Sequence, residues 1–372
     1  MIESAMKIAF VTDSYIPIPN GVAVSIESLR VTLERLGHNV YIFAPDYPGW
    51  SVKEKNIIRL PALFSPLNNT IPVKWPFLGL NQKKVQDLDI DIVHSHYFFK
   101  LFPLAIDIAK YSSAPLIHSF YRLFDRDINI KYARECSRII ALSKKSKKDL
   151  LDMGIAEEIN VLPVGIFTKD YASYPPKVVK SRFQIPEQRK ILLYVSRLDN
   201  ESEFIFLLKA FKNIWRAVED VHLLVVGGGD KLKYYFELTQ KQPFAKYITF
   251  TGFLPKKRLN KIFGACYLSV YPKRTDPEPL VLIESMAAGT PVVATVGQGA
   301  QDFVDDHKTG FITKATVEDF SDKIIELLRR EGLYLKFKHA SRSHAKRFST
   351  SILTRDLLEL YEQEITSAKN KF

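Results

Sequence analysis

Short runs of apolar residues alternate along this chain with longer segments in which apolar residues recur every three or four positions. The run at residues 7–12 has the length of a buried strand, and residues 39–44 form a second one. Between them, residues 22–36 carry the apolar spacing of one helix face. A strand, a helix and a strand in this order predict the start of a parallel α/β sheet.

The same alternation continues through most of the chain. Further strands are predicted at residues 57–60, 90–94, 116–120, 139–142, 160–163, 191–196, 221–226, 248–251, 268–271, 292–294 and 310–313. Helices are predicted at residues 97–110, 143–153, 204–218, 231–240, 256–265, 280–288, 317–330 and 353–365. Residues 61–80, which are rich in proline and aromatic side chains, are predicted to be an irregular loop.

Residues 167–189 interrupt the alternation with prolines and many charges, and we predict an interdomain linker near residues 168–178. A chain of 372 residues suits two domains of about 150–200 residues each. The pattern therefore predicts an α/β protein with two doubly wound domains in tandem.

Composition narrows the class of protein. No apolar run approaches the roughly 18 residues needed to cross a bilayer, and the first residues lack the pattern of a signal peptide. Two cysteines imply no disulfide framework, so we expect a cytoplasmic protein.

The positive charge is uneven along the chain. Lys and Arg number 21 against 18 Asp and Glu up to residue 175, and 32 against 23 after it. Such an excess attracts phosphates, nucleic acid or anionic lipid, but it also describes an ordinary solvated basic surface.

One stretch in the second half combines several signals. A strand at residues 268–271 is followed by a turn rich in charge and proline, and then by a helix that Gly289 ends. Asp276 lies in the turn and Glu284 on the helix, at the carboxyl end of a strand, where open α/β sheets bind ligands. Helix amides there could hold a phosphate, and the carboxylates could hold sugar hydroxyls.

Other strand ends carry candidate groups. Gly228, within a run of three glycines, would let backbone amides approach a phosphate, although no dinucleotide fingerprint or P-loop is present. Arg197 could clamp a diphosphate or form a surface ion pair. The histidines at residues 94, 96 and 118 lack zinc spacing with the cysteines, so we expect no metal site.

These segments together resemble glycosyltransferase family 4, a family of retaining enzymes that use nucleotide sugars and have the GT-B fold. The resemblance covers nearly the whole chain, in order. It is carried by residues 20–25, 91–96, 141–144, 162–166, 250–254, 274–284 and 287–293.

Four positions depart from the family pattern. Tyr121 stands where the family has a histidine, and Ser202 stands where it has a lysine. Asp276 replaces the first glutamate of the family's glutamate pair, and Pro279, which has no N–H, replaces a glycine. Each lost donor to a leaving diphosphate commonly costs about 2.7–4 kcal/mol in the transition state, unless a cation such as Lys273 fills in.

The resemblance implies a role for particular residues. Asp276, Tyr121 and Arg197 would be the catalytic residues, with Asp276 on the sugar hydroxyls and Arg197 on the diphosphate. Glu284 would hold the ribose. The full set of implied donor-binding residues is Gly21, Arg197, Ser202, Gly228, Leu254, Asp276, Leu280 and Glu284.

The resemblance also implies an arrangement and a reaction. Residues 1–170 would form an acceptor-binding Rossmann-like domain and residues 171–348 a domain that binds the nucleotide sugar, facing it across a cleft. Residues 349–372 would form a helix that crosses back to the first domain. A hexose such as glucose would move from a UDP-sugar to a hydroxyl with retention, and no metal or cofactor is implied besides the UDP-sugar substrate.

The acceptor suggested by the resemblance is a membrane lipid such as diacylglycerol, although a glycan is an alternative. An acceptor and membrane face would include Phe98 and Phe99 together with the lysines of one predicted helix. Those lysines are Lys144, Lys145, Lys147 and Lys148. The expected partners are a nucleotide sugar, the acceptor and an anionic membrane surface, with no nucleic acid, and the protein would sit at the inner face of the membrane.

Two alternatives remain. The departures at Tyr121, Ser202 and Pro279 favour a catalytically silent GT-B protein that binds a nucleotide sugar or a partner glycosyltransferase. An epimerase of similar two-domain shape is a weaker alternative.

Overall fold

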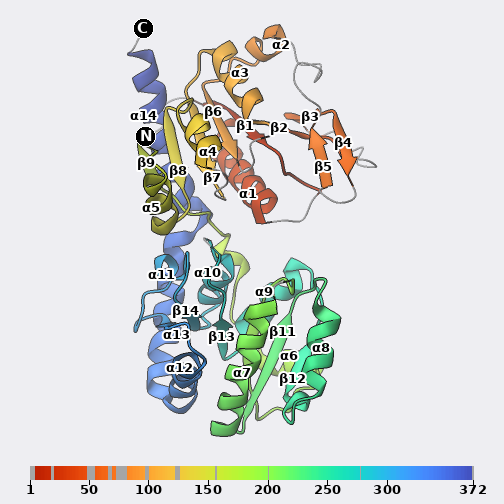
Figure 1. The fold of residues 1–372 in the computed structure, drawn as a ribbon. Coiled ribbons are helices and arrows are strands. Elements are labelled where there is room, and N and C mark those ends of the chain that lie inside the picture. Colours follow the sequence, from red (N-terminus) through yellow and green to blue (C-terminus); the bar gives the residue numbers. More distant parts are fainter. Residues whose placement is uncertain are drawn as a thin grey trace. The chain divides into compact units, whose positions relative to one another are not determined.

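The computed structural model describes residues 5–17, 21–47, 55–65, 69–72, 82–96, 100–121, 126–155, 157–199, 201–276 and 278–370. The chain divides into two compact units, coloured along the sequence in Figure 1. Unit 1 comprises residues 1–165 and 350–372, and unit 2 comprises residues 166–349. Residues 168–178, the predicted linker, therefore lie within unit 2.

Unit 1 is built on a parallel sheet of seven strands in the order β3-β2-β1-β6-β7-β8-β9. The strands are β1 (Lys7–Thr12), β2 (Asn39–Pro45), β3 (Ile57–Leu60), β6 (Ile92–His96), β7 (Leu116–Phe120), β8 (Arg138–Ala141) and β9 (Ile159–Val161). The order reverses between β1 and β6, which pair in parallel. Sheets of this kind bind ligands beside the carboxyl ends of the strands at such a reversal.

Helices cover the unit 1 sheet, as expected for a parallel sheet. They are α1 (Gly21–Arg35), α2 (Gln82–Gln86), α3 (Phe102–Ser112), α4 (Arg126–Ala133), α5 (Lys144–Asp152) and α14 (Thr350–Lys369). The C-terminal α14 packs against α1, and α2 packs against α3. Helix α14 is held by a contact between two residues that lie 267 positions apart in sequence. The Tyr361 hydroxyl lies 2.5 Å from Nδ1 of His94, and both side chains are buried.

Unit 2 has a parallel sheet of six strands in the order β12-β11-β10-β13-β14-β15. Its strands are β10 (Lys190–Val195), β11 (Val221–Val226), β12 (Ile248–Phe250), β13 (Leu268–Tyr271), β14 (Val292–Thr295) and β15 (Gly310–Thr313). The order reverses between β10 and β13. Successive residues of β10 enter different cores, with Leu192 on one face and Leu193 on the other, so both faces are buried.

Helices pack on both faces of the unit 2 sheet. They are α6 (Pro176–Arg182), α7 (Glu201–Ala217), α8 (Leu232–Gln240), α9 (Lys256–Ala265), α10 (Leu280–Ala287), α11 (Ala300–Phe303), α12 (Val317–Arg329) and α13 (Glu331–Ala345). Helices α7 and α12 contribute to one core, while α6, α9 and α10 contribute to the other. Short 3₁₀ turns at Thr168–Asp170, Ala245–Tyr247 and Lys346–Phe348 complete the chain.

The structure confirms most of the predicted elements and corrects three. Helix α10 ends as predicted: Gly289 adopts a left-handed φ of +81° and donates its N–H to Met286. Residues 61–80 are not entirely irregular, because β4 (Ala62–Ser65) and β5 (Asn69–Pro72) form an antiparallel hairpin.

The second correction concerns α3, which begins at Phe102 and not at residue 97. Asp13, which follows β1, accepts hydrogen bonds from the backbone N–H groups of Lys100 and Leu101, the two residues before the helix, and so holds the segment from which α3 starts. The third concerns residues 167–189, which contain α6 and bury Tyr171 and Val179 in the core of unit 2.

Candidate functional site

In unit 2 the candidate donor-binding residues gather around the carboxyl ends of β10, β11 and β13. Arg197 follows β10, the three glycines follow β11, and Asp276 follows β13 before α10 begins. Since β10 lies between β11 and β13 in the sheet, these loops share one edge at the strand-order reversal.

Glu284, on α10, has a buried carboxylate with two partners on one oxygen. The hydroxyl of Tyr171 donates to Oε1 over 2.8 Å, and the ammonium of Lys256 forms an ion pair with the same oxygen. Burial together with the adjacent Glu284 raises the pKa of Tyr171 far above its usual range, so the phenol stays protonated and donates. The two contacts fix the orientation of Glu284.

Asp276 is held by its own turn. The hydroxyl of Tyr271 donates to Oδ2 over 2.7 Å, and the backbone N–H of Glu278 donates to Oδ1 over 3.1 Å. The ammonium of Lys273 lies 3.7 Å from Oδ2. Burial and the Asp276 charge raise the pKa of Tyr271, which keeps it a donor. Asp276 is therefore a partly exposed carboxylate in a fixed position.

A second acidic side chain near Asp276 was missed by sequence reasoning. Glu203, on α7, is buried, and its pKa is raised mainly by burial, with Asp276 adding to the shift and Lys273 opposing it. The sequence signal was its position directly after Ser202, the altered family position. Lys273 therefore lies in the field of two carboxylates and brings positive charge to the altered end of the motif.

Arg197 forms an ion pair in this structure. Its Nε and Nη2 both lie 2.8 Å from Oδ2 of Asp199, and its side chain is 86% exposed. A side chain so exposed can exchange this partner for a phosphate at little cost. Asp199 also accepts from the backbone N–H of Asp230, which ties the Arg197 loop to the glycine loop.

The loop after β11 requires glycine at Gly227 and Gly229, because the backbone there is left-handed and leaves no room for a side chain. Gly227 and Gly229 have φ values of +140° and +151°, and a Cβ at Gly227 would lie 1.9 Å from the carbonyl oxygen of Ser196. A Cβ at Gly228 would meet only Phe253, at 3.8 Å. Phe253 is 76% exposed and precedes the half-buried Leu254, so the residue that adjoins Gly228 carries an uncovered aromatic side chain.

The remaining predicted donor residues are positioned by their helices. Leu280 is the first residue of α10, directly after Pro279. Ser202 lies in the first turn of α7, and its side chain is outside the described residues. Gly21 belongs to unit 1, where it is the exposed first residue of α1, and a Cβ added there would meet no described atom within 4 Å.

Unit 1 places Tyr121 at the corresponding edge of its own sheet. The Tyr121 hydroxyl lies 3.3 Å from Nδ1 of His96 and 3.4 Å from the hydroxyl of Ser25 on α1. His96 is 1% exposed, and burial lowers its pKa to about 3, so its ring is neutral near pH 7. Its Nε2 is buried and has no hydrogen-bond partner among the described residues.

The neighbouring histidines have structural surroundings. The rings of His94 and His96 lie 3.9 Å apart, and Nε2 of His94 lies 2.8 Å from the Ser119 hydroxyl. His118 packs edge-on against Phe102 and Phe120. Within the part of the chain that the structure describes, no group of three or more His, Cys, Asp or Glu side chains could hold a metal ion.

The predicted membrane face of unit 1 is partly described. The lysines at 144, 145 and 148 are exposed on α5, although Lys145 forms an ion pair with Asp149 and Lys147 donates to the carbonyl of Ile159 over 2.7 Å. Phe98 and Phe99 lie outside the described residues. Of the helices that the structure describes, none is long and apolar enough to cross a bilayer.

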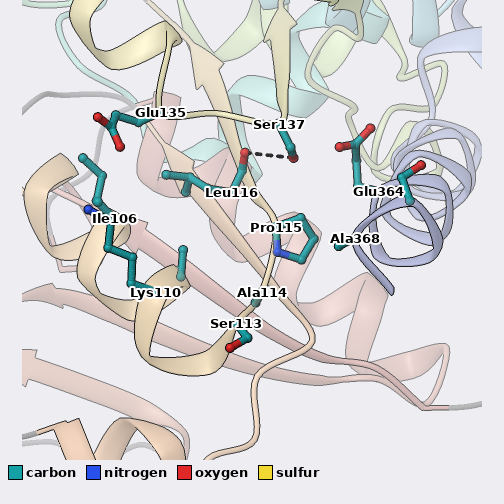
Figure 2. A pocket seen from close by; sticks show the side chains of 12 residues that line it. Ile106, Lys110, Ser113, Ala114, Pro115, Leu116, Glu135, Ser137, Glu364 and Ala368 are labelled. Atoms are coloured by element: carbon teal, nitrogen blue, oxygen red, sulfur yellow. Dashed lines mark hydrogen bonds between the residues drawn. The ribbon is translucent and has the colours of Figure 1, made fainter. Parts of the chain in front are cut away.

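A pocket of about 500 Å³ in unit 1 lies away from these residues. It opens where α3 ends, β7 begins and the last turns of α14 pass, as Figure 2 shows. The carboxylate of Glu364 at its rim accepts from Arg138 of β8 over 2.7 Å. The pocket is at the amino ends of the strands, which is opposite to the edge that carries Tyr121 and His96.

Two parallel-sheet α/β units with this topology define the class of protein, since solved glycosyltransferases of the GT-B fold share them. Sucrose-phosphate synthase from Thermosynechococcus elongatus matches with a TM-score of 0.77 and 20% identity, over 97% of this chain and all of that chain. Anabaena HepE in complex with UDP and glucose matches with a TM-score of 0.74 and 18% identity, over 96% and 100%.

The chain belongs to glycosyltransferase family 4. The family described as "Glycosyltransferase Family 4" matches residues 19–170, and "Glycosyl transferases group 1" matches residues 178–344. An alpha-monoglucosyldiacylglycerol synthase from Streptococcus pneumoniae is 26% identical over 87% of this chain and 78% of its own length. One from Acholeplasma laidlawii is 23% identical over 82% of this chain and 84% of its own.

Proposed function

We propose that this glycosyltransferase moves a hexose, with glucose as the first candidate, from a UDP-sugar to a hydroxyl of a membrane lipid such as diacylglycerol, with retention. It would work from the cytoplasm at the inner face of the membrane. The names of the two monoglucosyldiacylglycerol synthase relatives support the acceptor, and the complex of HepE with UDP and glucose supports the donor.

The observation that carries the proposal is the pair of fixed carboxylates, Asp276 and Glu284, on the turn and helix at the edge of the unit 2 sheet. Glu284 accepts hydrogen bonds from ribose hydroxyls, and it is oriented for this by Tyr171 and Lys256. Asp276 accepts from hydroxyls of the sugar. A carboxylate bound by several donors makes strong, charge-assisted hydrogen bonds to hydroxyl groups.

The uncovered ring of Phe253 offers a stacking face to the nucleobase, with Leu254 beside it. The amide of Gly228, where an added Cβ would meet only Phe253 at 3.8 Å, approaches the diphosphate. Arg197 leaves Asp199 to bind the phosphate oxygens, and Lys273 adds a second positive charge close to Asp276.

In the reaction the acceptor oxygen attacks the anomeric carbon on the face from which UDP leaves. The bond between that carbon and the phosphate oxygen breaks, and the acceptor proton passes to the departing phosphate. Arg197 and Lys273 stabilise the charge that develops on the diphosphate. We propose that this needs no metal, so that EDTA leaves the transfer rate unchanged.

The acceptor hydroxyl binds at the edge of the unit 1 sheet, where Ser25, His96 and Tyr121 offer neutral hydrogen-bonding groups. A neutral edge suits a glycerol hydroxyl better than an ionised acceptor, because no charge compensates for desolvation there.

The test is to incubate the protein with radiolabelled UDP-glucose and vesicles that contain diacylglycerol, and to determine the anomeric configuration of the product by NMR. An α-glucosyl lipid that forms equally with and without EDTA supports the proposal. Glucose transfer to a soluble glycan but not to lipid would overturn the acceptor, while transfer from another nucleotide sugar would overturn the donor.

A catalytically silent nucleotide-sugar binder is the second candidate, favoured by Pro279 at the start of α10 and by the pairing of Arg197 with Asp199. The same assay distinguishes it. UDP binding measured by calorimetry, without transfer or donor hydrolysis, would establish the silent protein.

A further inference from the structure

A small groove on unit 2 combines an apolar floor with unpaired positive charge. It lies between α6 and α9, which pack against one another, and encloses about 190 Å³. Val179 and Ile262, both 4% exposed, form part of its floor with Leu254 and Phe183. Close packing sets its shape: a Cβ at Gly264 of α9 would lie 1.9 Å from the carbonyl oxygen of Ala172.

Three cations line the groove, namely Arg182 of α6 and Arg258 and Lys261 of α9, and no Asp or Glu is among the described lining residues. Lys261 lies over the ring of Tyr174 at 5.4 Å, and Arg182 over the ring of Phe183 at 5.9 Å. These ring contacts hold the stems across the apolar floor and keep the charged heads at the rim.

Two neighbouring cations of the same helices differ, because each has a carboxylate partner. Lys256 of α9 pairs with Glu284, and Lys177 of α6 lies 3.6 Å from Glu187. No ion pair joins Arg182, Arg258 or Lys261 to any residue that the structure describes. The groove therefore gathers three cations without a carboxylate partner, and this charge complements an anion.

Size and polarity indicate which anion. Pockets for nucleotide-sized ligands enclose roughly 300–1,000 Å³, so this groove is too small for a second nucleotide. A free phosphate would leave the apolar floor unused. Val178, which is 49% exposed on α6, adds an apolar contact at the rim. A phospholipid supplies both a phosphate for the cations and an acyl chain for the apolar surface.

We propose that the groove between α6 and α9 binds the headgroup of an anionic phospholipid and so attaches unit 2 to a membrane surface. This site is separate from the membrane face predicted on α5 of unit 1. It does not depend on the proposed donor or acceptor, because lipid binding is measured without either substrate.

Flotation with vesicles of phosphatidylcholine, with and without about one third phosphatidylglycerol, tests the proposal. The triple variant Arg182→Gln, Arg258→Gln, Lys261→Gln should reduce the partition coefficient on anionic vesicles about 100-fold, since each cation near the surface contributes roughly a five-fold factor. The matched control Lys209→Gln, Lys212→Gln, Lys241→Gln removes the same charge from exposed positions of unit 2 and should change it less than about three-fold.

A site-specific signal complements flotation. In a Val178→Trp variant with the three cations intact, brominated anionic lipid should quench a larger fraction of the tryptophan fluorescence than it quenches in the parent protein. The proposal would be overturned if the two triple variants lost the same fraction of the partition coefficient, or if the parent protein did not bind anionic vesicles. It would also be overturned if millimolar inorganic phosphate, at constant ionic strength, released the protein from the vesicles. The last result would identify a free-phosphate site. Thermal unfolding of each variant shows whether it is folded.

Discussion

The two sheet edges that carry the candidate residues differ in charge. In unit 1 the edge presents His96, Tyr121 and Ser25, which are neutral and largely buried. In unit 2 it presents the carboxylates of Asp276 and Glu284 with Lys256 and Arg197. The same kind of parallel sheet therefore supports a neutral binding surface in one unit and a charged one in the other. The difference lies in the residues that follow the strands.

This contrast fits the division of labour that we propose for the units. A diphosphate and a polyhydroxylated sugar need fixed charges and acceptors, which unit 2 supplies. A glycerol hydroxyl needs neutral partners, which unit 1 supplies. Four predictions test whether each edge behaves as its chemistry implies.

The largest effect concerns acid and the neutral edge. Burial lowers the pKa of His94, His96 and His118, the last two to about 3, so these rings are neutral when folded. Unfolding below pH 6.5 lets them take up protons, so the free energy of unfolding of unit 1 falls as pH falls from 6.5. His38, whose pKa is also lowered by burial, adds to this uptake of protons. Asp13, with a pKa raised to about 7 by burial, binds a proton when folded and offsets one of these protons. The free energy of unfolding of unit 1 therefore falls by about 3–4 kcal/mol per pH unit.

Hydrogen exchange of β6 and β7 in urea, at about pH 6.5 and pH 4.5, measures this loss. Unit 2 is the internal control. It has one described histidine whose pKa is clearly lowered, His222, to about 4, so its slope should be smaller. Equal slopes in the two units would contradict the neutral character of the unit 1 edge.

The next largest effect concerns Asp276. Asp276→Asn keeps the shape of the side chain but removes the charge that we propose binds the sugar, and kcat should fall about 100–1,000-fold, as it does for the loss of one transition-state contact. Steady-state glucosyl transfer measures it. Glu237→Gln, an exposed change on α8, should leave kcat unaltered, and a fall below three-fold for Asp276→Asn would remove Asp276 from the proposed role.

Glu284→Gln should raise the KM for UDP-glucose about 10–100-fold with a smaller change in kcat, because a charged hydrogen bond contributes about 1.5–3 kcal/mol to binding. Titration of UDP by calorimetry checks the same loss without turnover. If Glu284→Gln lowered kcat and left UDP affinity unchanged, Glu284 would act on the reacting sugar and not on the ribose.

The smallest effect is expected at the neutral edge. Tyr121→Phe removes a hydroxyl with contacts of 3.3 and 3.4 Å, and one neutral hydrogen bond contributes about 0.5–1.5 kcal/mol. The kcat/KM for the acceptor should therefore fall less than about ten-fold, while the KM for the donor stays constant. A hundred-fold loss would show that Tyr121 acts in the chemical step and that the two edges are not so different.

Periodicity was sufficient for the regular elements, because buried parallel strands and amphipathic helices have local signatures. It predicted β1 with its bounds and α10 with the glycine that ends it. Prediction from periodicity failed where the local structure depends on residues that are distant in sequence. The hairpin of β4 and β5 has no strong local signal, and the segment before α3 is held by Asp13, which lies 87 residues from Lys100.

The candidate site shows the same division. The strand ends that carry Asp276, Glu284 and Arg197 were visible in the sequence, because loops after parallel strands share one edge. The groups that act on them were not. Tyr171 lies 113 residues from Glu284, and Lys256 lies 28 residues away. The proximity of Glu203 to Asp276 results from the folding of unit 2, and the sequence pattern did not indicate it.

By itself the sequence determined that the chain has two α/β domains and which turn and helix carry the carboxylates, since these depend on local pattern and spacing. The glycosyltransferase class was indicated only by the resemblance to family 4. The tertiary structure alone decided that Tyr171 and Lys256 orient Glu284, and that Tyr271 holds Asp276. It also decided that the histidines of unit 1 are neutral. The reason is physical: burial and charge at a side chain depend on neighbours brought together by folding, and no local spacing specifies them.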